Sequence, residues 1–365
     1  MSAVLLRLGG TAVLLVTLSD IFFTVLFPAS GHGPLRRPLS FLVWRAFRWL
    51  ARGFHGPRRR QVLAYVGPTL VAVSIAVWPI LLTVGWAMII YPALGSGVVA
   101  SGGQTPHTWM TAIYFSGFSV TTLGNGDIVP ATGAYRLLAV TEAAIGFSVV
   151  SMVITYFLSI YNAIVQRKTF AASLDHRTMR TGDSSQLVAG LARQGDVTAV
   201  VDQLSTTGEF LQRLFETHQS YPVLRYFHYR EVRYALPRVL LVTLDTAALI
   251  TSALRGGDEQ GVRDAALTLV DGAARDLLGE LLDRRRAASA PVREELLRAR
   301  YAQAVDRFRE AGLRVREEPG AVEDYLRRRG TWEEQLRTLA DVMLYDWAEI
   351  EPLQEWTRGA ASRSS

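Results

Sequence analysis

Residues 121–127 have the sequence TTLGNGD, which could bind a dehydrated cation through backbone carbonyl oxygens. Such a cation needs oxygen ligands in place of its water, and successive carbonyls from several subunits, aimed at one axis, supply them. Consecutive carbonyls point the same way only if alternate residues adopt left-handed backbone angles, which Gly124 and Gly126 do without steric cost. The Thr122 hydroxyl adds an oxygen at the inner end. The predicted cation ligands are Thr122, Leu123, Gly124, Asn125 and Gly126.

Helices that cross a membrane must hold this irregular backbone, because it is tolerated at membrane depth only where it lines a watery cavity. Three apolar stretches, residues 8–27, 62–91 and 137–164, reach the about 20 residues that a crossing takes. The apolar run at 107–120 is too short to span and is predicted to be a re-entrant helix. The predicted fold class is therefore an all-α membrane protein.

The charges orient these helices. Up to Thr169 the chain has 12 basic and three acidic residues, whereas the remainder has 27 basic and 30 acidic ones. Eight arginines and no acidic residue lie at 36–60, so the positive-inside bias places this loop in the cytoplasm. We expect a multi-pass plasma-membrane protein with its N-terminus outside and its C-terminal region cytoplasmic. Nucleic acid is not an expected partner, because the basic excess belongs to the membrane half.

The arginine-rich segment has two interpretations. Arg45, Arg48 and Arg52 recur at helical spacing among apolar residues, as they would in a voltage sensor. We favour an amphipathic helix on the inner membrane face, because the apolar run is short and follows Pro38. Anionic lipid is then an expected partner at residues 36–60. A cleaved signal peptide is the alternative for the first apolar stretch, but it would leave the arginines outside.

The sequence around residues 121–127 resembles potassium channels, whose filter pattern is T-x-G-Y-G-D. Residues 108–116 resemble their pore helix, with Tyr114 and Phe115 where these channels have an aromatic pair. The resemblance implies a filter that binds K⁺. One filter motif occurs in the chain and a closed ring needs four, so a homotetramer is expected. The residues predicted to support the filter are Thr121, Asp127, Tyr114, Phe115 and Glu142.

The resemblance extends over residues 62–164. Gly146 falls at the spacing of the inner-helix hinge glycine of bacterial two-helix channels. Other residues at matching spacings are Pro130, Thr132, Arg136 and Leu137. Below the glycine, a stripe at helical spacing is predicted to line the inner cavity and to gate by dewetting, with contact to lipid or another helix as the alternative. The predicted gating residues are Gly146, Phe147, Val150, Ile154 and Leu158.

Asn125 departs from the family pattern, which has Tyr or Phe at this position. The aromatic ring braces the filter against the pore helix, and Asn is too short to do so in the same way. Its backbone carbonyl remains, and Asn tolerates unusual backbone angles. Potassium selectivity is favoured. The alternatives are a weakly selective cation channel and, from another class, a non-conducting membrane sensor with a vestigial pore.

Two carboxylates fall inside predicted membrane spans, where they are costly and usually face protein or water. Glu142 lies four residues before Gly146. It either bonds to the pore helix and tunes the filter, or packs between helices against a hydroxyl. For Asp20 a structural hydrogen bond is favoured.

The chain beyond residue 167 is predicted to be an all-α cytoplasmic domain of five to seven helices. The expected domains are residues 1–28, 29–61, 62–166 and 167–365. The chain has no cysteine and none of the common nucleotide-binding or hydrolase motifs, so we expect no enzyme, no cofactor and no metal besides K⁺. The aromatic block around His228 is predicted to be packed core rather than a ligand-binding or pH-sensing site. No ligand of this domain follows from the sequence.

Overall fold

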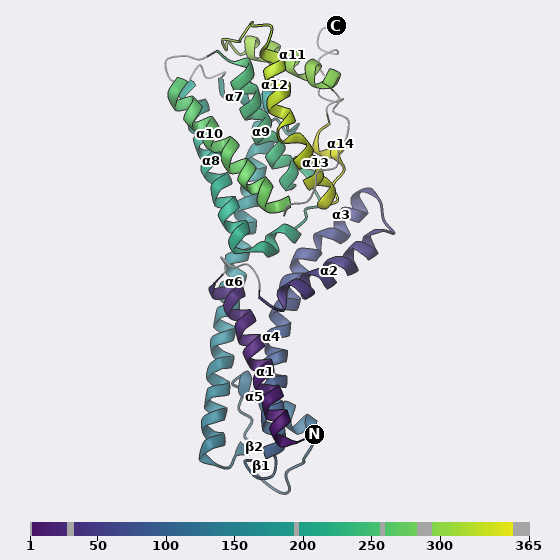
Figure 1. The fold of residues 1–365 in the computed structure, drawn as a ribbon, viewed down its shortest axis with the longest axis vertical. Helices are drawn as coiled ribbons and strands as arrows, with labels where there is room; N and C mark the ends of the chain where they lie inside the picture. Colours follow the sequence, from purple (N-terminus) through teal and green to yellow (C-terminus); the bar gives the residue numbers. More distant parts are fainter. Residues whose placement is uncertain (1, 28–32, 193–196, 256–259, 283–293, 353–365) are drawn as a thin grey trace. The chain divides into compact units, whose positions relative to one another are not determined.

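The computed structural model describes residues 2–27, 33–192, 197–255, 260–282 and 294–352 (Figure 1). The chain forms two compact units. The first comprises Met1–Gly53 and Tyr65–Asn162, and the second comprises Phe54–Ala64 and Ala163–Ser365.

The first unit is mostly helical. Its helices are α1 (Ala3–Ile21), the π-helical turn η1 (Phe22–Leu26), α2 (Arg36–Ala51), α4 (Val66–Ile90), the 3-10 turn η3 (Tyr91–Ala93), α5 (Trp109–Val120) and the first part of α6 (Gly133–Arg177). Three helical stretches that include α1, α4 and α6 are long and apolar enough to cross a membrane: Ala3–Leu26, Gly56–Ala93 and Gly133–Arg177. They contain the three predicted spans except for Phe27, one residue beyond the first stretch, so the predicted all-α membrane fold is confirmed.

Helix α1 packs closely along α4. A Cβ atom at Gly10 would lie 2.5 Å from the Gly85 carbonyl oxygen, so larger residues would push the two backbones apart. The Asp20 carboxylate of α1 accepts a hydrogen bond from the Trp78 indole N–H at 2.9 Å, and a second from the Leu35 backbone N–H at 2.8 Å. The structural hydrogen bond predicted for Asp20 is thus present, and it joins α1 to α4.

Helix α2 carries the arginine-rich segment. Among the described residues, it is not one of the helices long and apolar enough to cross a membrane. Its exposed side chains include Arg45 and Arg48 and four large apolar residues. The four are Phe41, Leu42, Trp49 and Leu50. This mixture is typical of a helix that lies in the membrane interface, which favours that interpretation over a voltage sensor.

A short antiparallel sheet lies in the first unit and was not predicted. Strand β1 (Val98–Ala100) pairs with β2 (Ile128–Pro130), and Val99 is opposite Val129. Because β2 follows residues 121–127 directly, the pairing connects the far end of the predicted filter to the segment after α4.

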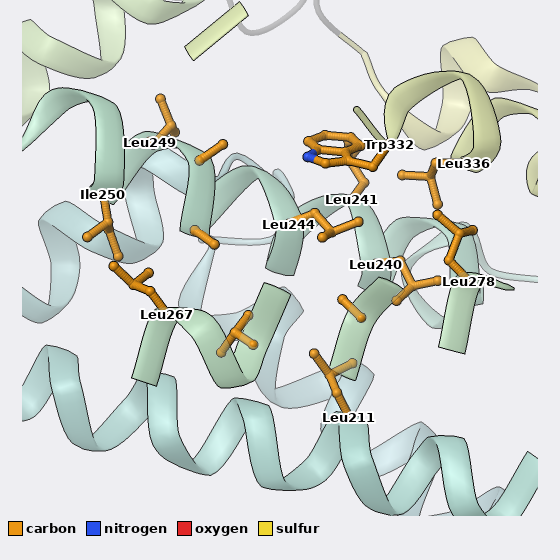
Figure 2. Close-up of a cluster of buried hydrophobic side chains, with 14 of the residues drawn as sticks. Leu211, Leu240, Leu241, Leu244, Leu249, Ile250, Leu267, Leu278, Trp332 and Leu336 are labelled. Atoms are coloured by element: carbon orange, nitrogen blue, oxygen red, sulfur yellow. The ribbon is translucent and has the colours of Figure 1, made fainter. Parts of the chain in front are cut away.

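The second unit is a helical bundle around α9 (Leu236–Ala253). Its other elements are α3 (Gly56–Ala64), the end of α6, α7 (Ser184–Ala192), α8 (Val197–Ser220), η4 (Pro222–Tyr226), η5 (Val232–Tyr234), α10 (Gln260–Leu282), α11 (Glu294–Glu310), α12 (Ala321–Gly330), α13 (Glu333–Val342) and α14 (Trp347–Ile350). By length and composition α9 could also cross a membrane, but 94% of it is buried inside the bundle. Figure 2 shows Leu240 and Leu244 of α9 among Leu211, Leu278 and Trp332 of other elements. Helix α9 is therefore the core helix of this unit.

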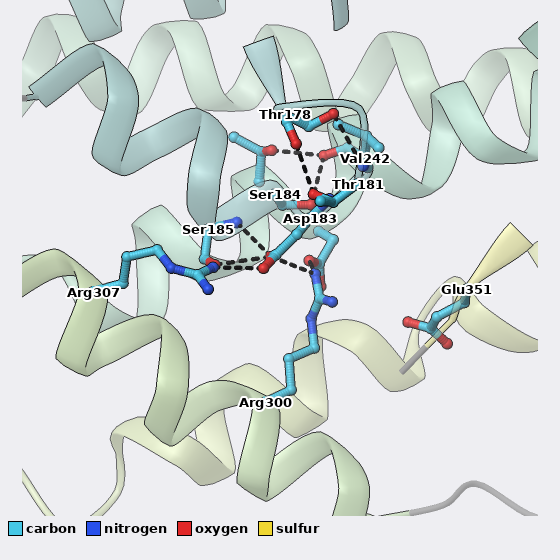
Figure 3. Close-up of polar contacts among 12 residues, drawn as sticks. Thr178, Thr181, Asp183, Ser184, Ser185, Val242, Arg300, Arg307 and Glu351 are labelled. Carbon is cyan, nitrogen blue, oxygen red and sulfur yellow. Dashed lines mark hydrogen bonds and ion pairs between the residues drawn. The ribbon is translucent and has the colours of Figure 1, made fainter. Parts of the chain in front are cut away.

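Buried charges in this core are paired. The Asp245 carboxylate of α9 accepts hydrogen bonds from the Arg329 guanidinium and the Tyr325 hydroxyl, both at 2.8 Å, and it also pairs with Arg300. Arg300 lies 3.6 Å from Asp183 as well, whose other contacts appear in Figure 3. Burial raises the pKa of Asp245, but the two guanidinium groups outweigh burial and hold that pKa below its usual range.

Replacing Asp245 with Asn is expected to destabilise the protein by about 3–5 kcal/mol, because Arg300 and Arg329 would each lose a buried counter-charge and keep only their other carboxylate partners. A carboxyl with a lowered folded-state pKa stabilises the fold above its ordinary pKa, and this stability is lost as pH falls through the lowered value. The deficit of the variant should therefore shrink in acid. Urea unfolding of the full chain in detergent measures both effects. Asp264→Asn, at an exposed position of α10, is the control, and equal stability of the two variants would contradict the expectation.

The aromatic block around His228 is packed, as predicted. The His228 ring stacks on Tyr345 with centroids 6.1 Å apart. Burial lowers the pKa of His228 to about 4 and that of His218 to about 3, so both stay neutral near pH 7. Neither histidine titrates in the range that a physiological pH sensor needs.

Candidate ion-binding site

Helix α5 leads into the predicted filter. It begins at Thr108, whose side-chain oxygen accepts a hydrogen bond from the Thr111 backbone N–H at 3.2 Å, a standard N-cap. The predicted support residue Phe115 is buried in an apolar cluster with Ile90 and Ile128. At the other end, Thr121 is the C-cap residue, so the irregular backbone starts where α5 stops.

The backbone of residues 121–127 alternates in handedness. Its φ angle is +59° at Thr122, +61° at Gly124 and +78° at Gly126. The left-handed angles predicted for the two glycines are confirmed, and Thr122 adds a third that its residue type did not predict. Among the residues that the structure describes, none donates a hydrogen bond to the carbonyl oxygens of residues 121–126. These oxygens are therefore available as ligands for a cation.

All seven residues of this loop are exposed in the single chain. Lipid does not tolerate non-helical backbone with unsatisfied polar groups, so a loop between two membrane-crossing helices must face water or other protein. Further copies of the chain around a common axis would meet this requirement. They would also bring more carbonyl oxygens to the same cation.

Asn125 contacts the pore helix. Its side-chain amide donates a hydrogen bond to the Tyr114 hydroxyl at 2.6 Å, and the Tyr114 ring packs edge-on against Phe118 with centroids 5.2 Å apart. Asn125 does not reach the helix with a ring of its own, as expected from its length, but it contacts α5 through the hydroxyl of Tyr114. In this contact the aromatic ring is that of Tyr114 on α5, and the polar group is the amide of Asn125 in the loop of residues 121–127.

The outer end of the loop is fixed by backbone hydrogen bonds. The Asp127 carbonyl accepts one from the Ser101 N–H at 2.8 Å, beside the β1–β2 pairing. The Asp127 carboxylate accepts one from the Ile128 N–H at 3.0 Å. Ser101 did not stand out in the sequence, because a serine in a glycine-rich loop carries no distinctive signal.

Glu142 lies on α6 and is fully buried beside Ser116 of α5. Within the described residues, its two carboxylate oxygens have no hydrogen bond of normal geometry. The position next to the pore helix fits both open interpretations, filter support and packing against a hydroxyl.

Gly146 makes a close contact with the end of α5. A Cβ atom at this position would overlap the carbonyl oxygen of Val120, the residue just before Thr121. The glycine therefore lets α6 pack directly against the residue that precedes the loop of residues 121–127. Helix α6 continues through this point as one helix, and a hinge here remains a prediction. Below it, the side chains of Phe147, Val150, Ile154 and Leu158 are all more than half exposed in the single chain.

Part of the chain is similar to known proteins. Residues 73–162, which include α5, the loop and most of the two flanking spans, match a family model described as an ion channel. The match is to this segment, about a quarter of the chain. The chain is also similar to the uncharacterized membrane protein YdjJ of Bacillus subtilis (strain 168), with 30% identity over 224 residues. That alignment covers 60% of this chain and 62% of the relative, less than two thirds of its length. No solved structure matches the chain.

Proposed function

We propose that this protein is a subunit of a potassium-selective channel. The observation that carries the proposal is the alternation of left-handed backbone at Thr122, Gly124 and Gly126. In the part of the chain that the structure describes, the six successive carbonyl oxygens of residues 121–126 accept no hydrogen bond. The match of residues 73–162 to the ion-channel family supports the conducting role. The ligands would be the carbonyls of residues 122–126 with the Thr122 hydroxyl, and the passing ion is K⁺.

The same proposal includes four copies of the chain in the plasma membrane. One loop per chain cannot close a ring, and the exposed stripe below Gly146 offers side chains to line a shared cavity. The positive-inside bias favours an outer N-terminus and a cytoplasmic second unit. Anionic lipid headgroups are the proposed partners of α2, whose exposed arginines and apolar residues suit a membrane surface.

Weakly selective conduction is the second candidate, and it rests on the loss of the family aromatic at position 125. The Asn125–Tyr114 hydrogen bond favours the selective channel, because it fixes the loop against α5. A non-conducting sensor is the candidate from another class.

Recording from purified protein in planar bilayers separates the three functions. A selective channel gives a reversal potential that follows the K⁺ gradient when Na⁺ replaces K⁺ on one side. A reversal potential near zero in that mixture indicates weak selectivity. The channel proposal would be overturned if protein with a detergent-corrected mass of about four times 40.3 kDa showed no conductance.

Removing either end of the Asn125–Tyr114 hydrogen bond should change ion discrimination. Asn125→Leu and Tyr114→Phe each delete one partner with little change in size. If the bond sets how rigidly the carbonyls are held, each variant changes the K⁺-to-Na⁺ permeability ratio and the double variant changes it no further, with a coupling of about 0.5–3 kcal/mol. Asn125→Tyr is expected to raise the ratio or alter inactivation, unless the added ring overpacks against Tyr114.

Bi-ionic reversal potentials at matched expression measure these ratios. Met110→Leu, at an exposed position on the same helix, is the control. Independent, additive effects of the two deletions would show that the hydrogen bond does not control selectivity.

A further inference from the structure

The last described segment of the second unit, residues 345–351, is held by arginines from distant elements. Its helix α14 has four residues and is too short to be stable alone. Arg60 of α3 forms an ion pair with Glu349. Arg329 of α12 forms another with Glu351, and both of these side chains are fully buried.

A third arginine binds the main chain of this segment. Arg238 of α9 donates hydrogen bonds to the carbonyl oxygens of Glu349 and Ile350, and also to that of Thr181. The backbone makes room for this side chain at Gly182, where φ is +66° and a Cβ atom would overlap the guanidinium. Arg238 therefore joins residues 345–351 to the core helix and to the turn after α6.

Tyr345 connects the same segment to α6. Its hydroxyl accepts a hydrogen bond from the Tyr229 backbone N–H at 2.9 Å and donates one to the Tyr229 carbonyl at 3.2 Å. The Tyr229 ring lies 5.0 Å from the Arg167 guanidinium, and Arg167 is a buried residue of α6. Arg167 also donates to the carbonyls of Leu224 and Phe227 in the same loop, each at 3.4 Å.

These contacts reach α6 and α3, the helix that directly precedes α4 in the sequence. The helical stretch Gly56–Ala93 contains α3 and α4, so Arg60 lies just before the first flanking helix. Arg167 lies on α6, the second flanking helix. Residues 345–351 thus contact α3 directly and α6 through Tyr229.

We propose that residues 345–351 form a C-terminal latch that couples the helical bundle to α4 and α6 and thereby controls opening of the pore. The coupling rests on the channel function proposed above. The Arg60–Glu349 pair is the reversible contact of the latch. Its side chains are 17% and 38% exposed, whereas those of the Arg329–Glu351 pair are 0% exposed. Water and salt can compete for the first pair but not for the second.

The test removes the reversible contact in the full-length protein. Glu349→Gln and Arg60→Gln should each change the closed-to-open ratio in bilayers about two- to fivefold, in the same direction, which is the range for a partly exposed ion pair. The double variant should change it no more than either single one, and Arg60→Glu with Glu349→Arg should restore it in part. Hydrogen exchange should rise in residues 56–64 and 163–177 as well as in residues 345–351.

The matched control is Glu209→Gln, which removes the exposed Arg213–Glu209 pair of α8. Glu349→Gln that behaves like this control in gating and in hydrogen exchange would overturn the latch. If Glu349→Gln conducts and shows increased hydrogen exchange but an unchanged closed-to-open ratio, the latch does not control the pore. If the wild type does not conduct, the channel proposal fails, and hydrogen exchange alone tests the latch. A rise in exchange confined to residues 345–351 would then refute the coupling. A rise in residues 56–64, 163–177 and 345–351 would support it.

Discussion

Alanine at Gly124 or Gly126 should abolish selective current. Both glycines have left-handed backbone angles, and an L-residue held there costs about 1–2 kcal/mol. In a ring of four copies the cost becomes about 4–8 kcal/mol, enough to favour a rotated peptide that turns a carbonyl away from the ion. The space around each glycine is open in the single chain, so the effect is conformational and the chain should still fold.

Gly117→Ala is the matched control for this prediction. Gly117 lies inside α5, where Ala is a better helix former, and its added methyl would meet Thr83 at an ordinary 3.8 Å. Reversal potentials and single-channel conductance are the measurements, with tetramer assembly checked by mass. Normal selective currents in Gly124→Ala and Gly126→Ala would remove residues 121–127 from the conduction path.

Gly146→Ala should also eliminate selective current, for a different reason. The new methyl group would overlap the backbone carbonyl of Val120, which no side-chain rotation relieves. Either α6 or the end of α5 must move, and the residue after Val120 begins the ion-binding loop. Overpacking of this kind costs about 1–3 kcal/mol, so we expect a folded but less stable protein with a displaced loop.

The measurement distinguishes this packing role from the predicted hinge. A packing role predicts altered K⁺-to-Na⁺ permeability and a lower unfolding temperature in detergent. A hinge predicts an unchanged permeability ratio with fewer openings. Ser148→Ala, at an exposed position two residues further along α6, is the control. Unaltered selectivity and stability in Gly146→Ala would contradict the packing role.

Properties that depend on near neighbours in the chain followed from the sequence. The lengths of the apolar runs predicted the three spans, and the glycine spacing predicted left-handed angles at Gly124 and Gly126. In the second unit, apolar periodicity located most helices, but the described residues contain eight from α7 to α14, more than the five to seven expected. Helix α12 is rich in charged residues and α14 is a single turn, so neither gives a clear apolar pattern of its own.

Contacts between distant residues could not be predicted in the same way. Whether an apolar helix crosses a membrane or fills a core depends on what surrounds it, so α9 resembles a span in composition while 94% of it is buried in the bundle. The contact of Asn125 with α5 could not be predicted, because it depends on the hydroxyl of Tyr114, 11 residues earlier. The β1–β2 pairing had no signal, since each strand has three residues.

The sequence by itself determined the three apolar stretches, the short helix between the last two, and the left-handed angles at Gly124 and Gly126 in the loop of residues 121–127, because these depend on hydrophobic length and on backbone sterics within a few residues. Only the tertiary structure decided what holds that loop: Tyr114 at its middle, Ser101 at its outer end, and Val120 against Gly146 at its inner end. Likewise, only the folded bundle brings Arg60 to Glu349, residues that lie 289 positions apart. A hydrogen bond or close contact needs atoms within a few ångströms, and the folded chain alone specifies which distant residues come that near.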